Sequence, residues 1–396
     1  MESRYLQPAV ERAMKVQEVI LKAISGEITW IEAAEILRIS PRQMRRKKKR
    51  YERYGYDGLF DRRTRQPSPR RVPVSQVGTV LRLYRDEYFD HNVAHFHEKL
   101  VEKHGMQLSY TWVKTCLQAA GLVARRKKNV PHRRRRERRP LVGMMLHLDG
   151  SPYAWFGPEH PVCDLLVVMD DATSEVYEAR FVREEDTRST MGVLKATVER
   201  RGIFCSLYSD RASHFVWTPK AGERPDRNRL TQVARALAEL GIELILANSP
   251  QARGRGERLF GTWQGRLPPE LRLAGITTME GGNRYLQEHF IPWHNRTFTV
   301  RPAERGSAFV SAKRASLDRI FSIHRKRTVA ADNTVQVGNK ILQIPKSHLR
   351  MGFTHCRVTV YEYLDGTFSI GLGPHELGQY DSGGNLQELP ERRKAA

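Results

Sequence analysis

Three phrases of sequence decide the fold: Leu146-His147-Leu148-Asp149-Gly150, Leu207-Tyr208-Ser209-Asp210-Arg211 and Gly254-Arg255-Gly256-Glu257-Arg258. Asp149 and Asp210 each follow a short apolar run, and Glu257 opens a helical pattern. Sixty residues separate the first acid from the second, and 46 separate the second from the third. We predict that the fold brings the three carboxylates together to hold catalytic metal ions.

The residues around these phrases show alternating strand and helix patterns. Apolar runs predict strands at 146–148, 165–169, 177–182 and 242–246 and a short one ending at Tyr208, and three- and four-residue spacing predicts helices at 188–201, 230–240 and 255–264. Three strands followed by alternating helices and strands are typical of a mixed sheet with helices on its faces. In such a sheet, strand ends bring residues that are distant in sequence to one edge. A helix beside that edge would add Glu257.

The three acids suit metal-dependent chemistry on phosphate groups. Mg²⁺ prefers oxygen ligands and keeps several waters, so a few carboxylates are enough to hold it. Two such ions, about 3.5–4 Å apart, can activate an attacking oxygen and stabilise a leaving oxygen. Each acid also has a simpler interpretation: Asp149-Gly150 is typical of a hairpin turn, Asp210 could cap a strand end, and Glu257 could be a solvated helix residue. Together, in this order and on these elements, they favour a metal site.

A family resemblance rests on four phrases, which are Leu148-Asp149-Gly150-Ser151, Asp170-Asp171-Ala172-Thr173-Ser174, Cys205-Ser206-Leu207-Tyr208-Ser209-Asp210-Arg211 and Ser249-Pro250-Gln251-Ala252-Arg253-Gly254-Arg255-Gly256-Glu257-Arg258. This stretch resembles the RNase H-like catalytic core of DDE transposases and retroviral-type integrases. Its phrases closely resemble the ISNCY group of bacterial insertion-sequence transposases, and the resemblance extends over most of the chain. It implies that Asp149, Asp210 and Glu257 are the catalytic acids and the ligands of Mg²⁺ or Mn²⁺.

One departure from the retroviral pattern is the longer gap before Glu257. Residues 218–229 are polar and contain two prolines and a glycine, so they read as an inserted loop. The gap leaves Glu223, Glu239 and Glu243 as alternative third acids. Glu257 is favoured because Glu243 lies inside a strand-like run and Glu239 on an amphipathic helix.

The chain is strongly basic. Its 396 residues include 67 Lys and Arg against 44 Asp and Glu, a formal net charge of +23, which predicts a polyanionic partner. Residues 125–139 alone hold ten basic residues against one acid. We expect this segment to lie along a DNA backbone. The basic residues assigned to this contact are Arg125, Arg126, Lys127, Lys128, Arg133, Arg134, Arg135 and Arg136.

Cysteine and histidine usage argues against a structural zinc site. The four cysteines are scattered and form no CxxC pair, a pattern compatible with a reducing cytoplasm. His91, His95, His97 and His104 cluster, but they lack the paired cysteines that the zinc-binding head of retroviral integrases requires. We find no apolar run of about 18 residues and no signal-peptide pattern. These features predict a soluble cytoplasmic protein, associated with the nucleoid and without membrane contact.

The first 62 residues show a helix-turn-helix pattern. A helical pattern covers residues 8–24, and Thr29 with Glu32 makes a capping box for a helix that reaches residue 37. Ser40 suits the N-cap of the next helix, with Pro41 at its first position and Gln43 at the reciprocal capping place. We expect one face of that helix to enter the DNA major groove; the simpler alternative is a basic helix that contacts only phosphate. The residues of that face are Arg42, Arg45, Arg46, Lys49 and Arg53.

The rest of the chain supplies a second helical unit and a β-domain. Residues 59–74 read as a linker, and helical patterns at 77–88, 93–103 and 110–120 predict either a second helix-turn-helix or a structural three-helix packing. Residues 290–305 read as an irregular closing segment, in which His294 and Asn295 could approach the site but better suit packing. From residue 328 the period changes to two, which predicts a small antiparallel β-domain with a hairpin turn at Asp365-Gly366.

We therefore expect a multidomain chain. Its predicted parts are a helix-turn-helix domain (1–62), a second helical domain (63–124), a basic linker (125–140), an α/β RNase H-like catalytic core (141–305), a barrel-like β-domain (306–377) and a disordered tail (378–396).

The resemblance implies a metal-dependent DNA transposase of the polynucleotidyl transferase class. Such an enzyme binds the terminal inverted repeats of its element, cleaves the element ends and joins the 3′-hydroxyls to target DNA by transesterification. The sequence lacks a G-x-x-x-x-G-K-[ST] loop, so we expect no nucleotide cofactor. Cleavage of two ends by separate sites implies a homo-oligomer on double-stranded DNA. The alternatives are a structure-specific nuclease on the same fold and a DNA-binding regulator with an inactive core.

Overall fold

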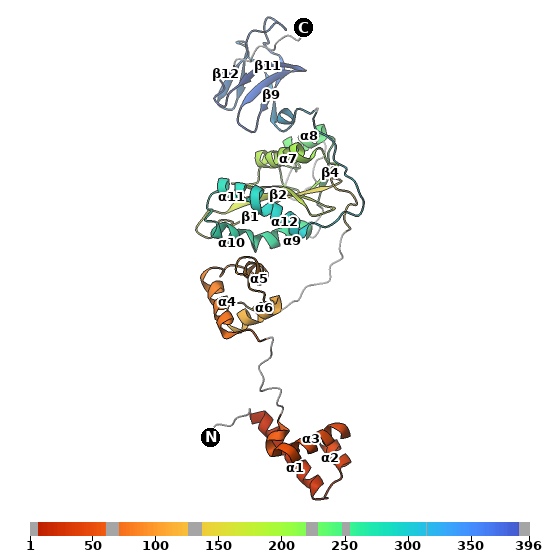
Figure 1. The fold of residues 1–396 in the computed structure, drawn as a ribbon. Helices are drawn as coiled ribbons and strands as arrows, with labels where there is room; N and C mark the ends of the chain where they lie inside the picture. Colours follow the sequence, from red (N-terminus) through yellow and green to blue (C-terminus); the bar gives the residue numbers. More distant parts are fainter. Residues whose placement is uncertain are drawn as a thin grey trace. The chain divides into compact units, whose positions relative to one another are not determined.

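The computed structural model describes residues 7–60, 71–125, 137–218, 229–247, 254–313 and 315–387. By their contacts these residues divide into two units, Met1–Arg82 and Leu83–Ala396. The predicted fold class is confirmed, because N-terminal helices precede a central mixed sheet and a C-terminal antiparallel sheet (Figure 1). Within the described residues, no helix has the length and apolar character needed to cross a membrane.

The first unit holds the helices α1 (Gln7–Ile24), α2 (Trp30–Ile36) and α3 (Pro41–Tyr54), followed by the 3₁₀ helix η1 (Gly55–Leu59). Both predicted capping boxes form, Thr29 with Glu32 at α2 and Ser40 with Gln43 at α3. Ile20 and Met44 are buried in the core that the helices share. Apolar packing on one side of α3 leaves its basic side free for solvent.

The second unit begins within α4 (Val74–Asp86) and continues into α5 (Val93–Glu102) and α6 (Tyr110–Ala119). Asn92 and Ser109 cap the starts of α5 and α6 with their side chains. Phe96, Leu100 and Val113 are fully buried, as the helical spacing predicted.

The central sheet has the strand order β3-β2-β1-β4-β5. β1 (Leu146–Tyr153), β2 (Cys163–Asp170) and β3 (Val176–Val182) form an antiparallel meander, and β4 (Ser206–Ser209) and β5 (Glu243–Leu246) extend it in parallel to β1. This is the mixed sheet expected of an integrase-type core.

Helices cover both faces of this sheet (Figure 1). The helices of one face are α7 (Thr187–Arg201) and α8 (Gln232–Glu239), and those of the other are α9 (Gly254–Gln264), α10 (Leu267–Leu273), α11 (Met279–Tyr285) and α12 (Ile291–Phe298). Leu146 and Leu148 of β1 join the core under α7 and α8. Because side chains alternate along a strand, His147 and Asp149 point to the face that α9 covers.

The structure corrects two boundaries of this core. β1 continues to Tyr153 and makes no hairpin turn at Asp149-Gly150, because β2 pairs with it beyond both residues. Residues 290–305 are not irregular throughout, because a π-helical turn (Leu286–Phe290) leads into α12. The buried Phe290 and Ile291 hold that helix against the sheet.

The C-terminal part starts with a short helix, α13 (Leu317–Ile320), and a five-stranded antiparallel sheet of order β12-β11-β10-β9-β6. The strands of that sheet are β6 (Ile323–Thr328), β9 (Arg357–Glu362), β10 (Phe368–Leu372), β11 (His375–Tyr380) and β12 (Leu386–Gln387), and β7 (Thr334–Val337) pairs with β8 (Lys340–Gln343). The prediction of disorder from residue 378 is wrong as far as residue 387. β11 pairs with β10, and the ring of Tyr380 is fully buried in this domain's core. Residues 388–396 lie outside the described residues.

His294 of α12 makes the stability of the core depend on pH. Its side chain is buried, and the Trp263 indole Nε1 donates a hydrogen bond to its Nδ1 at 3.0 Å. Burial lowers the pKa of His294 to about 4. In the unfolded chain the same histidine has a pKa of about 6.5, so on acidification the unfolded state binds a proton before the folded state does. The contribution of His294 to stability is therefore complete above about pH 6.5 and is lost as the pH falls toward 4.

We expect the free energy of unfolding to fall by about 2–3 kcal/mol between pH 7 and pH 4 from this residue alone. Denaturant titrations at both pH values would measure it. The His294→Gln variant, which keeps an acceptor for Trp263 but does not titrate, should lack this component. An identical pH dependence in variant and wild type would contradict the assignment.

Candidate active site

Strands β1 and β4 run side by side just before Asp149 and Asp210. In the parallel pairing of β1 with β4, Leu146 lies opposite Leu207 and His147 opposite Tyr208. Asp149 follows His147 by two residues in β1, and Asp210 follows the end of β4 at Ser209, so a continuation of this register would bring the two acids opposite each other. The rings of His147 and Tyr208, with centroids 5.1 Å apart, show that side chains of this face meet across the two strands.

Helix α9 brings Glu257 to the same place. A Cβ atom added to Gly256 would lie only 2.2 Å from Oδ2 of Asp149, so the first turn of α9 touches that carboxylate directly. Glu257 is the next residue and is exposed. Further along the helix, the Gln264 side chain donates to Oγ of Ser151 at 3.1 Å, so α9 runs beside β1. The three acids therefore belong to backbone segments that meet at one edge of the sheet.

The carboxylates themselves are arranged less tightly than their backbones. Asp149 and Asp210 are half-buried, and an Asp210 oxygen accepts a hydrogen bond from the Ala212 amide at 2.9 Å. Across the described ranges, the three side chains do not form a group in which all potential ligand oxygens lie within 4.8 Å of one another. The backbone of α9 thus lies close to Asp149, but within the described residues the carboxylate oxygens of the three acids are not grouped closely enough to bind one ion together.

The alternative third acids lie elsewhere or outside the described residues. Glu239 is on α8, on the opposite face of the sheet, and pairs with Arg235 at 3.0 Å. Glu243 is the exposed first residue of the edge strand β5. Glu223 lies outside the described residues. The contact of α9 with Asp149 therefore favours Glu257 over both described alternatives.

A buried ionic network, absent from our sequence predictions, holds the start of α9. Asp171, just after β2, is 2.6 Å from Nε2 of His147, accepts a hydrogen bond from the Arg139 amide at 2.7 Å, and pairs with Arg255. Burial opposes ionisation of Asp171, but these partners outweigh burial and hold its pKa well below the usual range. Because Arg255 lies two residues before Glu257, the network ties the helix to β1 and β2. The Asp170-Asp171 phrase was visible in the sequence, but its partners were not.

The C-terminal end of the basic segment is hydrogen-bonded to residues of this network. The Arg255 guanidinium donates to the Glu137 carbonyl at 3.0 Å. The Arg138 guanidinium donates to the Asp171 carbonyl at 2.9 Å and to Oγ of Ser174 at 2.8 Å. Residues 137 and 138, at the C-terminal end of the basic segment, therefore lie beside the start of α9 and the end of β2. Arg125 is exposed, whereas the other basic residues assigned to this segment fall in 126–136, outside the described residues.

A second carboxylate lies against β1 on the face opposite Asp149. A Cβ added to Gly150 would come 2.1 Å from Oε2 of Glu185. The other oxygen of Glu185 is 3.1 Å from Nε2 of His214. No sequence pattern marked these two residues as neighbours of the site.

The five basic residues predicted for DNA contact on α3 are all exposed. Met44, on the other side of the helix, is buried in the domain core. The predicted packing roles of His294 and Asn295 are confirmed, since His294 accepts from Trp263 and Asn295 bonds the Val176 backbone in both directions at 2.8 Å.

Comparisons with known proteins agree with this architecture. A helix-turn-helix domain model matches residues 17–68. The chain is 31% identical over 370 residues to the putative transposase y4bF of Sinorhizobium fredii (strain NBRC 101917 / NGR234). The aligned region covers 93% of this chain and 80% of that protein. It is 29% identical over 304 residues to the transposase for insertion sequence IS1202 of Streptococcus pneumoniae, spanning 68% of this chain and 65% of that relative.

Two solved structures were also matched. One is the simian T-cell lymphotropic virus intasome in complex with PP2A regulatory subunit B56 gamma, at 13% identity and a TM-score of 0.32, covering 79% of this chain and all of that one. The other is the HTLV-2 integrase catalytic core domain in complex with magnesium, at 14% identity and a TM-score of 0.30, covering 41% of this chain and 93% of that one.

The helix-turn-helix match and the transposase relative together define a DNA-binding protein. The chain belongs to the family of transposases that includes the y4bF protein, with which it shares nearly its whole length.

Proposed function

We propose that this transposase is a DDE enzyme of the ISNCY group, with Asp149, Asp210 and Glu257 as its catalytic acids. The observation that carries the proposal is the meeting of three sequence-distant segments. Strand β4 pairs with β1 up to Tyr208, two residues before Asp210, and a Cβ at Gly256 would lie 2.2 Å from an Asp149 oxygen; both observations support the proposal. The enzyme cleaves the ends of its element and joins their 3′-hydroxyls to target DNA.

The donor set fits Mg²⁺ or Mn²⁺. Three carboxylates, two half-buried and one exposed, supply only oxygen ligands and leave room for water, as these ions require. When bound, two such ions stabilise the attacking and leaving oxygens of phosphoryl transfer. Asp149 and Asp210 would hold the ions from the sheet edge, and Glu257 from α9. The Asp171 network keeps α9 in place beside them.

We propose that two basic parts of the chain bind double-stranded DNA. The exposed face of α3 would read the terminal inverted repeats, and the segment 125–140 would follow the phosphate backbone toward the site. We propose that the chain has three further domains: a helical domain (63–124), the catalytic core (141–305) and the β-domain (306–377). Two element ends need two cores, so the active form is a homo-oligomer on DNA.

A strand-transfer assay tests the proposed reaction. Labelled DNA that carries the element ends is incubated with the full chain, a target plasmid and Mg²⁺. We expect joined products that disappear when the metal is chelated and that need no nucleotide. Cleaved ends without joined molecules would identify a nuclease instead, and binding without either product would identify an inactive core.

Arg45 tests whether α3 reads bases. The Arg45→Ala variant should weaken binding to the cognate ends by about 1–3 kcal/mol if its guanidinium contacts a base edge. Titrations on cognate and random DNA at one salt concentration would measure it. Lys15→Ala, which removes an exposed charge from α1 of the same unit, is the matched control. An equal loss on random DNA would reduce Arg45 to a phosphate contact.

A further inference from the structure

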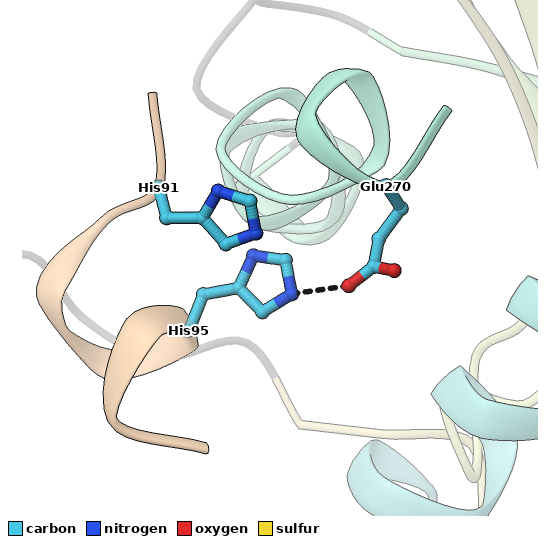
Figure 2. Close-up of side chains that lie close together, drawn as sticks. All are labelled: His91, His95 and Glu270. Carbon is cyan, nitrogen blue, oxygen red and sulfur yellow. Dashed lines mark hydrogen bonds and ion pairs between the residues drawn. The ribbon is translucent and has the colours of Figure 1, made fainter. Parts of the chain in front are cut away.

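Two buried histidines of the second unit each have one nitrogen without a hydrogen-bond partner. His91 and His95 are 2% and 3% exposed, and their rings stack with centroids 4.4 Å apart and planes 25° apart. Figure 2 shows the two rings one above the other, with the carboxylate of Glu270 beyond His95. Nε2 of His91 and Nδ1 of His95 are among the buried side-chain atoms that have no hydrogen-bond partner within the described residues.

The other nitrogen of each ring faces a carboxylate. Nδ1 of His91 lies 2.9 Å from Asp90, and Nε2 of His95 lies 2.5 Å from Glu270. A neutral imidazole that donates its N–H to a carboxylate carries a bare lone pair on its second nitrogen. Carboxylates hold the rings of metal-binding histidines in this way, and they also raise the basicity of the ligating nitrogen. For His91 this leaves the lone pair of Nε2 available to an ion, whereas His95 can share an ion with Glu270 only through Nε2, the nitrogen that faces that carboxylate.

We propose that His91, His95 and Glu270 bind one divalent d-block ion such as Zn²⁺, at a site separate from the catalytic acids. The three residues offer one potential ligand atom each, and these atoms lie within 4.8 Å of one another. Tetrahedral zinc holds its nitrogen and oxygen ligands about 2.0–2.2 Å away, so adjacent ligands lie about 3.3 Å apart. Small side-chain rotations reach that spacing. Two histidines and a glutamate leave the fourth position to water.

The surrounding charges select the class of metal. Lys99 lies 2.5 Å from the same Glu270 oxygen, and Arg272 lies 2.7 Å from Asp90. A hard ion such as Mg²⁺ would gain little electrostatic attraction from carboxylates that already have cationic partners. An ion that bonds well to imidazole nitrogen still gains binding energy from the two histidines. This favours zinc or a neighbouring first-row transition metal. Lys99 is the competitor that the ion displaces from Glu270.

The ion would join two parts of the second unit. His91 precedes α5 and His95 lies within it, whereas Glu270 lies in α10, 175 residues beyond His95. Neighbouring polar contacts follow the same boundary: Arg266 holds Glu98 through both of its oxygens, and Asn92 donates to the Gly265 carbonyl at 2.9 Å. The metal would thus have a structural role, linking the helical segment that contains α5 to α10 of the core. This proposal does not depend on the proposed reaction.

Metal analysis of the full chain tests this site. Protein from zinc-supplied cells is exchanged into metal-free buffer, and its zinc content is measured by mass spectrometry. We expect about one zinc per chain in the wild type and in Asp149→Asn, which excludes the catalytic acids as its source. His91→Gln and His95→Gln should each lose most of it. His97→Gln is the matched control, because His97 lies on the same helix but bonds the Leu108 carbonyl.

A second measurement protects against variants that fail to fold. Wild-type chain, stripped with a chelator and titrated with Co²⁺, should develop the visible absorption of a four-coordinate site at one equivalent. Zn²⁺ should raise its midpoint of thermal unfolding, and excess chelator should reverse the rise. A metal-free wild type with no cobalt spectrum would overturn the proposal. Equal zinc loss in His97→Gln and His95→Gln would also overturn it.

Discussion

Glu257→Gln should abolish joining of element ends, lowering the rate at least about a thousandfold, which corresponds to ~4 kcal/mol of lost transition-state stabilisation. The glutamine side chain has nearly the same shape, but it loses the negative charge that a metal ligand supplies. Asp149→Asn and Asp210→Asn should behave alike, since each removes one of the proposed metal-binding carboxylates. Single-turnover strand-transfer assays in Mg²⁺ would measure the three rates.

Controls for this prediction lie within the same core. Glu239→Gln and Glu243→Gln change the two described alternative acids and should leave the joining rate within about twofold of wild type. All variants should keep their affinity for the element ends, because the proposed recognition surface is on α3 of the first unit. Normal joining by Glu257→Gln, or loss of joining only in Glu239→Gln, would refute the assignment of the third acid.

Gly256→Ala should lower the joining rate by about a hundredfold, because misplacing a catalytic group by about 1 Å costs this much. The added methyl would lie 2.2 Å from an Asp149 oxygen, far inside van der Waals contact, so either α9 or the aspartate must shift. The prediction concerns geometry alone, since no charged group is removed. The assay is the same strand-transfer measurement, combined with circular dichroism to show that the fold is retained.

The matched control is Gly261→Ala on the same helix. No atom lies within 4 Å of a Cβ at Gly261, so the substitution meets open space. It should leave the joining rate unchanged and should stabilise the helix by up to about 1 kcal/mol, the ordinary gain from alanine over glycine. Equal activity of the two variants would mean that α9 does not lie against Asp149 during the reaction.

Much of the local structure was predictable from the sequence because its signals are local. The side chains of Ser40 and Gln43 satisfy backbone groups within three residues, so the start of α3 could be read directly. Apolar spacing predicted α7 and α9 to within one residue, because each buries one face against the sheet. The end of β1 could not be placed in this way. Pairing with β2, a partner on another segment, carries that strand through Asp149-Gly150.

The residues around the candidate site separate in the same way. Asp149, Asp210 and Glu257 were found from their order and their elements, whereas His147, Asp171 and Arg255 meet only through strand register and helix packing. The histidine cluster at 91–104 predicted no zinc site, because the paired cysteines of a retroviral-type zinc-binding head are missing. The third ligand proposed here, Glu270, comes from a helix 175 residues away from His95.

The sequence by itself determined the helix caps, the strand and helix order and the basic character, and it singled out Asp149, Asp210 and Glu257 as candidate acids. Each of these depends on side chains that act within a few residues, or on charge that needs no folding to exist. Only the tertiary structure decided that β4 ends beside β1 just before Asp210, that Gly256 brings α9 against the Asp149 carboxylate, and that His91 and His95 lie close to Glu270. Those contacts depend on the register of hydrogen-bonded strands and on close packing between distant segments, which no local pattern encodes.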